Sequence, residues 1–376
     1  MKIQYFLLTC VILPFCLVLG QTTKTNSVQK KYFGTLSSGE KIYSYTLTNS
    51  HGMSAEIINY GATVVKLKVP DKNGKIGDVI LGYDSLSGYV SGSSFFGGTI
   101  GRYGNRISKG RFTIDEKKYQ VTINDGENSL HGGIKGFNKE VWKAKIVKQD
   151  PPTVEFTYVS PDGDQGYPGT LTSTVTFNLT EKNGLEINYK ATTNKPTIVN
   201  LTNHCYFNLT ANPENTILNQ VLMIKANKFT PIDSEFIPTG EIRSVKGTPM
   251  DFRKPTVIGS RINDNYQQLK NGKGYDHNFV LDNYNGKVRE VATVYDPSSG
   301  RFMKVFTDQP GIQFYSGNFL DGTTKGKYGI YYKHRTALCL ECQHFPDSPN
   351  HKNFPSTVLR PGNVYGQTSI YQFSVK

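Results

Sequence analysis

The segment Leu171-Thr-Ser-Thr-Val-Thr-Phe-Asn-Leu179 alternates apolar and polar side chains, apart from Ser173 on the apolar side. The alternation resumes in Leu185-Glu-Ile-Asn-Tyr-Lys-Ala191, after the turn-forming residues Lys182-Asn-Gly184. A period of two places successive side chains on opposite faces of a β-strand, and Asn-Gly is a strong signal for a tight turn. This part of the chain therefore predicts two antiparallel strands, each with one buried face.

The same alternation recurs on both sides of this pair. It is found in residues 41–47, 54–58, 63–69, 154–159 and 288–295. Long stretches of helical periodicity are almost absent, and no internal repeat or low-complexity linker divides the chain. The predicted fold class is all-β, as a single antiparallel domain. The chain is too long for a seven-strand sandwich, so we expect a large two-sheet sandwich.

Composition agrees with this prediction and narrows the function. The 376 residues include 23 Tyr, 21 Phe and 37 Gly but one Trp, which favours strands joined by tight turns over a helical bundle. The 43 Lys and Arg exceed the 30 Asp and Glu, giving a formal charge of +13. These basic residues are scattered, with no run of five or more. We therefore expect no nucleic-acid partner.

The first 20 residues have the pattern of a cleaved secretory signal peptide. Lys2 gives a positive start, residues 6–19 are almost continuously apolar, and polar residues follow Gly20. The apolar run is shorter than the ~20 residues that a membrane-spanning helix needs. We therefore expect residues 1–20 to be removed, with no membrane span in the mature protein.

Downstream of this segment, residues 21–30 predict a flexible leader and residues 31–376 the folded domain. The protein is then secreted or periplasmic. Lipoprotein anchoring at Cys16 is a weaker alternative, because bulky Phe15 precedes that cysteine where a small residue is usual. Asn178, Asn200 and Asn208 each begin a glycosylation triplet, and two of these flank a candidate catalytic segment, which favours bacterial export.

Residues 198–208, Ile-Val-Asn-Leu-Thr-Asn-His-Cys-Tyr-Phe-Asn, contain the first candidate catalytic group. Interpreted as a strand, this segment places Cys205 on an apolar face, and His204 and Tyr206 on the opposite, polar face. Asn203 interrupts the apolar face, which suggests a bulge or a local hydrogen-bonding role.

A second alternating segment, residues 337–345, contains Glu341. Leu340 and Cys342 form its apolar face, whereas Cys339 shares the face of Glu341. We expect Cys205 and Cys342 to be buried thiols in the core and Cys339 to approach the cleft. The Cys-Leu-Glu-Cys spacing lacks the second ligand pair of a zinc site, so we expect neither a metal nor a redox role.

Further candidates lie in another strand-like segment and in three loops. Gln313 lies on the polar side of residues 311–319, so that the polar faces of three strands could form one concave wall. The loops contain Asn105 with Arg106, then His131, then Asp276. Taken singly, each of these loop residues is better explained by a structural role, in a turn for Asn105 and Asp276 and in a backbone hydrogen bond for His131.

Together these segments resemble the aldose 1-epimerase (galactose mutarotase) family, from about residue 33 to residue 373. The stretches that carry the resemblance are Gly101-Arg-Tyr-Gly-Asn-Arg106, Ser129-Leu-His-Gly-Gly133, Asn200-Leu-Thr-Asn-His-Cys-Tyr-Phe-Asn-Leu209, Gly274-Tyr-Asp-His-Asn-Phe279, Pro310-Gly-Ile-Gln-Phe-Tyr-Ser-Gly-Asn-Phe-Leu-Asp-Gly322 and Leu340-Glu-Cys-Gln-His-Phe-Pro-Asp-Ser-Pro-Asn350, with Pro355-Ser-Thr and Leu359-Arg-Pro-Gly362. Several ordered motifs of this length make the resemblance highly specific.

The resemblance implies a single-domain, galactose mutarotase-like β-supersandwich that interconverts the α and β anomers of free aldohexoses such as galactose and glucose. It implies no cofactor and no metal. By similarity, His204 is the general acid and Glu341 the general base. The substrate-binding set that the family's motifs imply is Asn105, Arg106, His131, Asp276 and Gln313. We expect a monomer or weak dimer.

The chemistry fits these residue types. Opening a sugar ring removes the proton of the C1 hydroxyl and delivers one to the ring oxygen, so a base and an acid must act together. With ordinary pKa values of ~4.3 and ~6.5, Glu341 would be ionised and His204 could supply a proton at neutral pH. We also expect Tyr206 or Phe279 to cover the apolar face of the sugar.

Three alternatives remain open from the sequence. A non-catalytic carbohydrate-binding protein would need the binding set but no acid and base pair. A glycoside hydrolase would need a second catalytic carboxylate, for which Asp276 is the only candidate among these motifs. A hexose-phosphate epimerase would need additional basic residues at the site.

Overall fold

The computed structural model describes residues 1–4, 25–92 and 94–376. Apart from residues 1–4, the predicted signal peptide lies outside the described residues, and so does Cys16. The export of this chain therefore stays a prediction. Within the described ranges, no helix has both the length and the apolar character needed to cross a bilayer.

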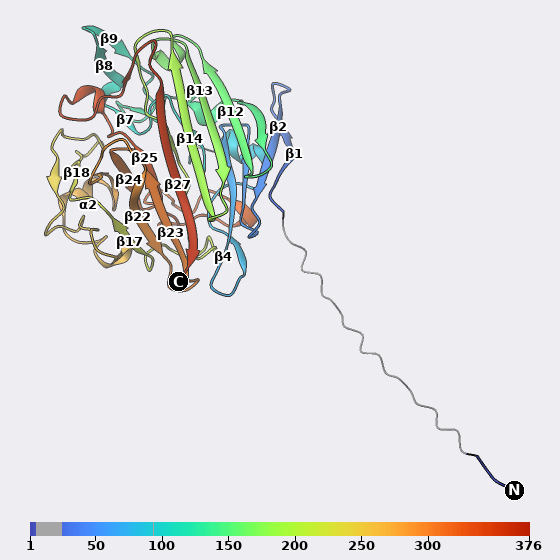
Figure 1. The fold of residues 1–376 in the computed structure, drawn as a ribbon. Coiled ribbons are helices and arrows are strands. Elements are labelled where there is room, and N and C mark those ends of the chain that lie inside the picture. The colour runs from blue at the N-terminus through green and yellow to red at the C-terminus, as the bar shows by residue number, and fades with distance from the viewer. Residues whose placement is uncertain (5–24, 93) are drawn as a thin grey trace.

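One long antiparallel sheet dominates the fold, and Figure 1 shows its central strands side by side. The strands, in spatial order, are β11 (Lys143–Lys148), β12 (Thr153–Ser160), β13 (Leu171–Leu179), β14 (Gly184–Thr193), β27 (Tyr365–Val375), β23 (Arg301–Thr307), β22 (Arg289–Tyr295), β17 (Val221–Ile224) and β20 (Thr256–Val257). The predicted pair is confirmed as β13 and β14, in a register that runs from Leu171 opposite Thr193 to Leu179 opposite Leu185.

A second sheet contains the first five strands in chain order. These are β1 (Ser27–Thr35), β2 (Lys41–Thr48), β3 (Ser54–Ile58), β4 (Thr63–Pro70) and β5 (Ile76–Asp78). The predicted leader over residues 21–30 is wrong for its last part, because β1 begins at Ser27 and pairs with β2. Val28 is buried in the core, so backbone pairing and apolar burial both order this stretch.

A third sheet carries much of the site. Its strands, in spatial order, are β19 (Arg243–Ser244), β18 (Lys228–Phe229), β21 (Asp276–Val280), β24 (Gly311–Tyr315) and β25 (Cys339–Gln343). Asp276 lies opposite Tyr315, and Gln313 lies opposite Glu341. One face of this sheet therefore gathers the polar side chains that the sequence pattern predicted.

The remaining elements are short. Four strand pairs are β7 (Arg106–Ile107) with β10 (Ser129–Leu130), β6 (Thr99–Ile100) with β16 (Thr202–Asn203), β8 (Arg111–Ile114) with β9 (Lys117–Gln120), and β15 (Thr197–Ile198) with β26 (Val358–Leu359). The helices are α1 (Leu86–Ser91) and α2 (Gln267–Asn271), with 3₁₀ turns η1 (Ser108–Gly110), η2 (Phe137–Lys139), η3 (Asp164–Gly166), η4 (Ile258–Ser260), η5 (Lys327–Gly329) and η6 (Ser348–Asn350).

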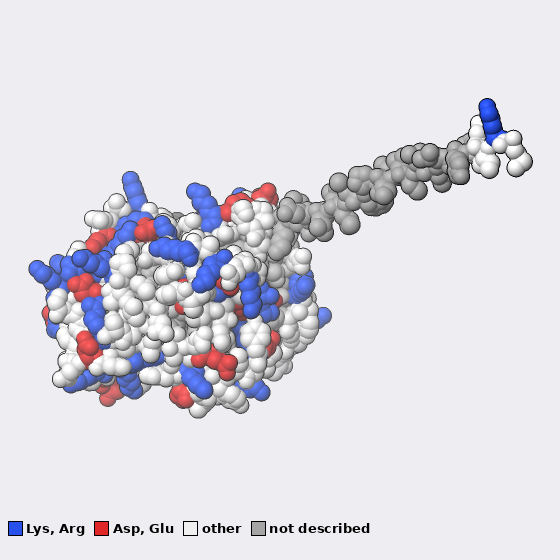
Figure 2. Space-filling model, turned by 90° about the horizontal axis from the view of Figure 1, so that it is seen from below, with Lys and Arg blue, Asp and Glu red and all other residues white. Residues whose placement is uncertain are grey.

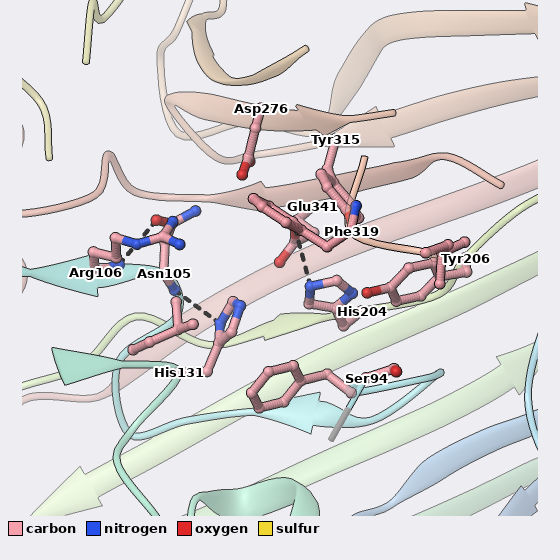
Figure 3. A pocket seen from close by; sticks show the side chains of 13 residues that line it. Ser94, Asn105, Arg106, His131, His204, Tyr206, Asp276, Tyr315, Phe319 and Glu341 are labelled. Carbon is pink, nitrogen blue, oxygen red and sulfur yellow. Dashed lines mark hydrogen bonds and ion pairs between the residues drawn. The ribbon is translucent and has the colours of Figure 1, made fainter. Parts of the chain in front are cut away.

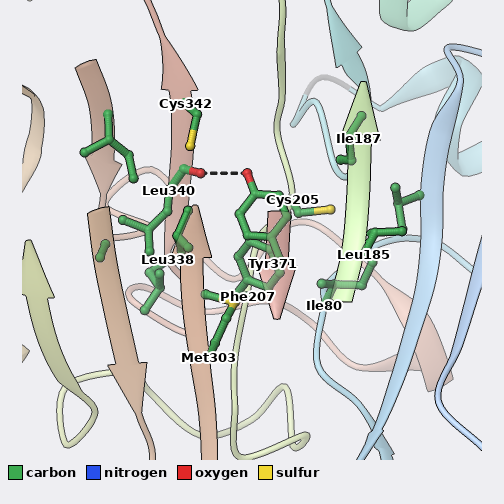
Figure 4. Close-up of a cluster of buried hydrophobic side chains, with 14 of the residues drawn as sticks. Ile80, Leu185, Ile187, Cys205, Phe207, Met303, Leu338, Leu340, Cys342 and Tyr371 are labelled. Carbon is green, nitrogen blue, oxygen red and sulfur yellow. Dashed lines mark hydrogen bonds between the residues drawn. The ribbon is translucent and has the colours of Figure 1, made fainter. Parts of the chain in front are cut away.

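The apolar face of the third sheet packs against the long sheet to form the main core, part of which is drawn in Figure 4. Cys205 and Cys342 both lie in this core, as their alternation predicted. The hydroxyl of Tyr371, on β27, donates a hydrogen bond of 2.8 Å to the carbonyl of Leu340, on β25. The two sheets are thus joined by apolar contact and by a polar link. The all-β, single-domain prediction is confirmed, but the described strands form three multi-stranded sheets and not the two expected.

The interpretation of residues 198–208 as one continuous strand is wrong. Extended ladder structure is limited there to the end of β15, to β16 and to isolated bridges at Asn200 and Phe207. Asn203 explains part of the irregularity, because its side chain donates to Gly97 O and accepts from the Cys205 N–H. The backbone of this segment also changes partner within a few residues, since the His204 N–H donates to Gly98 O and the Phe207 N–H donates to Leu338 O. His204 and Cys205 still point to different environments.

Charge is dispersed on the one face of the molecule that Figure 2 shows. Lys and Arg side chains are interspersed there with Asp and Glu and do not gather in one patch.

Candidate active site

A pocket of about 200 Å³ opens on the polar face of β21, β24 and β25 (Figure 3). This is below the ~300–1,000 Å³ of typical ligand sites, so the pocket suits one small polar molecule. Its lining residues are Ser94, Phe95, Asn105, Arg106, Leu130, His131, His204, Tyr206, Asp276, Tyr315, Phe319, Leu320 and Glu341. Six of the seven residues expected at the site line it.

Short pairings between distant segments bring the loop residues to this wall. Strands β7 and β10 place Arg106 opposite Leu130, which puts Asn105 and His131 beside each other. Strands β6 and β16 hold the chain just before His204. The site is therefore built from segments that are far apart in sequence and meet only in the folded sandwich.

His204 and Glu341 are in contact. Nε2 of His204 lies 3.6 Å from Oε1 of Glu341, and both side chains are almost fully buried. Tyr206 stacks nearly parallel to the imidazole with ring centroids 5.0 Å apart, and Phe95 does so at 5.8 Å. The imidazole is therefore held with one nitrogen aimed at the carboxyl group.

Burial shifts the pKa values of both groups away from their ordinary values. It lowers the pKa of His204 to about 4, because a charged imidazolium is poorly solvated there. Burial also raises the pKa of Glu341 well above its usual value, an effect that the charge of Asp276 increases and that of Arg106 opposes. Neutral imidazole beside neutral carboxylic acid is therefore the favoured state of the pair.

His131 is fixed in one tautomer. The backbone N–H of Asn105 donates to its Nδ1 over 3.1 Å, and burial holds the pKa of His131 well below the usual value. A neutral imidazole whose Nδ1 accepts must carry its proton on Nε2. His131 is thus a hydrogen-bond donor at the pocket. Both residues also have left-handed backbones, with φ of 64° at Asn105 and 51° at His131, a conformation that is typically strained outside glycine.

The same tautomer bears on metal binding. His131, His204 and Glu341 offer ligand atoms that lie within 4.8 Å of one another, and two histidines with a carboxylate are a common zinc-binding set. A metal bound at Nε2 of His131 would displace the proton that the Asn105 hydrogen bond keeps there. The residues present therefore fit a sugar hydroxyl better than a metal ion.

Gln313 is not among the lining residues, although it shares the polar face of the sheet with Glu341. Its Nε2 donates to Oδ1 of Asp276 over 2.7 Å, and both residues are buried. Burial raises the pKa of Asp276, whereas the nearby charge of Arg106 and the Gln313 hydrogen bond lower it. Gln313 therefore acts on the pocket through Asp276.

Arg106 is held from outside the pocket. Its Nε donates to Asp125 Oδ2 over 2.7 Å, and its guanidinium lies 4.7 Å from the ring centroid of Phe236. This arrangement keeps a cation beside the two pocket carboxyl groups.

The sequence predicted only part of the aromatic lining of the pocket. Tyr206 lines the pocket as expected, but Phe279 does not, because it packs into the core between the sheets. Phe319 lies in one of the motifs that carry the family resemblance, but the sequence did not mark it as a site residue. Phe95 lies between α1 and β6, where no sequence periodicity marks it. Both add apolar surface suited to the C–H face of a sugar.

Two of the glycosylation triplets are structural. The Asn200 amide donates to Gly104 O and His344 O, and the Asn208 amide donates to three backbone carbonyls. Both side chains are buried in the folded protein, so they serve as internal cross-links.

Comparison with known proteins agrees with this geometry. The family model described as Aldose 1-epimerase matches residues 43–372. The chain is 44% identical over 349 residues to galactose mutarotase of Bos taurus, covering 93% of this chain and 99% of that protein. It is 40% identical over 330 residues to aldose 1-epimerase of Escherichia coli K12, covering 87% and 94%.

Solved structures give the same result. The crystal structure of galactose 1-epimerase from Lactobacillus acidophilus has a TM-score of 0.82 at 28% identity, covering 93% of this chain and 99% of that one. An aldose epimerase homologue from C. elegans has a TM-score of 0.77 at 32% identity, with the same coverage. The chain therefore belongs to the aldose 1-epimerase family.

Proposed function

We propose that this chain is a mutarotase that interconverts the α and β anomers of free aldohexoses such as galactose and glucose, with Glu341 as general base and His204 as general acid. The observation that carries the proposal is the 3.6 Å contact between His204 Nε2 and Glu341 Oε1 in a buried, sugar-sized pocket. O1 and the ring oxygen O5 are bonded to the same carbon, so an acid and a base that serve both must themselves be neighbours.

Ring opening starts from the carboxylate of Glu341 and the imidazolium of His204. Glu341 takes the proton of the C1 hydroxyl, the C1–O5 bond breaks, and Nε2 of His204 gives its proton to O5. The product is the open-chain aldehyde, and the pair is now carboxylic acid and neutral imidazole. Each positioned proton transfer is typically worth about 10²–10⁴-fold in rate.

Ring closure reverses these steps after rotation about the C1–C2 bond. The O5 hydroxyl attacks the other face of the aldehyde, His204 takes its proton, and Glu341 returns a proton to O1. The pair carries one shared proton throughout, so burial shifts the balance between its two forms without changing the proton count. A proton that crosses from Glu341 to His204 restores the ring-opening form, which the charge of Arg106 favours because it lowers the pKa of Glu341.

The remaining polar residues bind the sugar. Asp276 accepts hydrogen bonds from hydroxyl groups, and Arg106 and the Nε2–H of His131 donate to hydroxyl or developing oxyanion oxygens. Asn105 orients His131, and Gln313 orients Asp276. Tyr206, Phe95 and Phe319 cover apolar faces.

Polarimetry on freshly dissolved α-D-galactose and α-D-glucose tests this function. We expect the purified protein to accelerate the approach to the equilibrium rotation in proportion to its concentration. Sugar binding by calorimetry without any acceleration would instead indicate a carbohydrate-binding protein. Release of reducing sugar from an aryl galactoside would indicate a hydrolase.

We also propose that the protein works outside the cytoplasm after removal of residues 1–20. The sequence pattern of this segment supports the proposal. Mass spectrometry of the mature protein from its native cells tests it, with a mature N-terminus at Gln21 expected and an intact Met1 contradicting it.

A further inference from the structure

The second ring nitrogen of His204 also has a partner. Its Nδ1 lies 3.5 Å from the Sγ atom of Cys339, and Cys339 is fully buried. Within the described part of the chain, no other side chain is hydrogen-bonded to this nitrogen. Nε2 on the opposite side of the ring faces Glu341. The imidazole is therefore bracketed by a thiol and a carboxyl group.

One strand supplies both partners. Cys339 and Glu341 are two residues apart on β25, so their side chains share a face. Their partners on β24 are Tyr315 and Gln313, respectively. Cys342, on the other face of the same strand, lies in the inter-sheet core. The strand thus sets the spacing between the two groups that meet the imidazole.

The thiol is neutral and weakly polar. Cys339 is a free cysteine, and burial raises the pKa of its thiol well above the usual value. A thiol is a weak donor and a weak acceptor. An imidazolium carries protons on both nitrogens, so when His204 is charged its Nδ1–H must point at Sγ.

We propose that Cys339 is a positioning residue for His204, whose sulfur accepts the Nδ1–H hydrogen bond and so leaves Nε2 as the atom that exchanges protons with the sugar. The inference rests on the proposed function, in which His204 is the acid. The Nδ1–H stays in place in both protonation states, and only Nε2 gains and loses a proton. His204 and His131 are then held in opposite tautomers by their Nδ1 partners, one by a weak acceptor and the other by a backbone donor.

A weak acceptor has a catalytic advantage here. A carboxylate at Nδ1 would stabilise the imidazolium and make it a poorer acid, as the Asp of a serine-protease triad stabilises its histidine. Sulfur provides orientation with little stabilisation of the charge. The imidazolium therefore gives up its Nε2 proton to the ring oxygen readily.

The groups that face His204 define what a pH profile would report. They are Cys339, Glu341, His131, Tyr206 and Tyr315, with Arg106 and Asp276 as charges acting through Glu341. Burial raises the pKa of both tyrosines far from neutrality and lowers that of His131. An acidic limb of the profile therefore reports the His204 and Glu341 pair.

Two substitutions at Cys339 test the proposal. Cys339→Ser supplies a stronger acceptor of similar shape, so the acidic limb of kcat/KM should move to higher pH by up to about one unit, the size expected from one neutral hydrogen bond. Cys339→Ala removes the acceptor, so kcat should fall about tenfold with KM changed less than about twofold. Cys342→Ala is the matched control, because it truncates a buried thiol on the same strand away from His204 and should leave the pH profile unchanged.

Nitrogen-15 NMR of the wild-type imidazole gives a readout independent of turnover. We expect neutral His204 to show a protonated Nδ1 and an unprotonated Nε2. The opposite tautomer, or equal shifts of the pH profile in Cys339→Ser and Cys342→Ala, would overturn the proposal. If wild-type protein failed to accelerate mutarotation, the proposed function would fail, while the tautomer would still decide the role of Cys339.

Discussion

Gln313 donates a hydrogen bond of 2.7 Å to Asp276, which lines the pocket. The two residues lie on neighbouring strands, β24 and β21, and neither strand alone would hold the carboxylate in place. This contact separates a residue expected to touch the sugar from one that supports it. It leads to a prediction about which kinetic constant each substitution changes.

Gln313→Leu removes the hydrogen bond and leaves Asp276 with a higher pKa, so its carboxylate binds sugar hydroxyls less well. We expect KM for galactose to rise about tenfold, as for the loss of one charge-assisted hydrogen bond, with kcat changed less than about twofold. Polarimetric kinetics over a range of sugar concentrations measure both constants. Gln267→Leu, which removes an exposed amide hydrogen bond to Asn271 on α2, is the control and should leave KM unchanged. A fall in kcat at constant KM would refute the supporting role.

The pH dependence follows from burial of the acid and base pair. The pair needs one shared proton, and a second proton reaches His204 only near its pKa of about 4. We expect kcat/KM to be constant from neutral pH down to about pH 5 and to fall below about pH 4, where neither group can act as base. Polarimetry corrected for spontaneous mutarotation measures the profile. A fall in kcat/KM centred near the ordinary histidine pKa of ~6.5 would show that His204 is not desolvated in the working enzyme.

Arg106→Gln removes the cation that lowers the pKa values of Glu341 and Asp276. Both groups then carry less negative charge, so we expect kcat to fall and KM to rise, each by about tenfold or more. Arg106→Lys keeps the charge and should retain more of kcat than Arg106→Gln. Arg243→Gln, at an exposed ion pair, is the control and should leave kcat and KM unchanged. Equal kinetics for the Lys and Gln variants would count against an electrostatic role.

Asn208→Ala tests whether the buried asparagine is an internal cross-link. Its amide donates to Asn212 O, Asn215 O and Thr336 O, which would lose their partner. We expect the free energy of unfolding to fall by about 2–3 kcal/mol in denaturant titrations. Asn178→Ala, at a more exposed triplet, should change it by less than about 0.5 kcal/mol. Similar losses in both variants would contradict this role.

Sequence alternation predicted the regular strands well because half-buried strands carry their own signal. β13 and β3 match their predicted bounds, and the parity of Cys342 against Glu341 on β25 is confirmed. Alternation failed at residues 198–208, where the backbone pairs in short pieces with several distant segments. Such contacts depend on distant segments that a local pattern does not contain.

The membership of the site was largely predictable, but its electrostatics and layering were not. Ordered motifs identified His204, Glu341 and Asp276, because each stands in a distinctive stretch. The shifted pKa values of the pair arise from burial by the assembled sheets, which sequence does not quantify. The hydrogen bond from Gln313 to Asp276 and the pocket wall formed by Phe95 likewise appear only once the segments are packed.

The most direct test of the account is the turnover of Glu341→Gln, measured by polarimetry together with galactose affinity from calorimetry. The amide keeps the size of the side chain but cannot accept the O1 proton, so we expect turnover to fall by about 10²–10⁴-fold while affinity stays within a few-fold. Glu290→Gln, at a surface ion pair, should behave as wild type. Near-wild-type turnover of Glu341→Gln would contradict the assignment of Glu341 as the base.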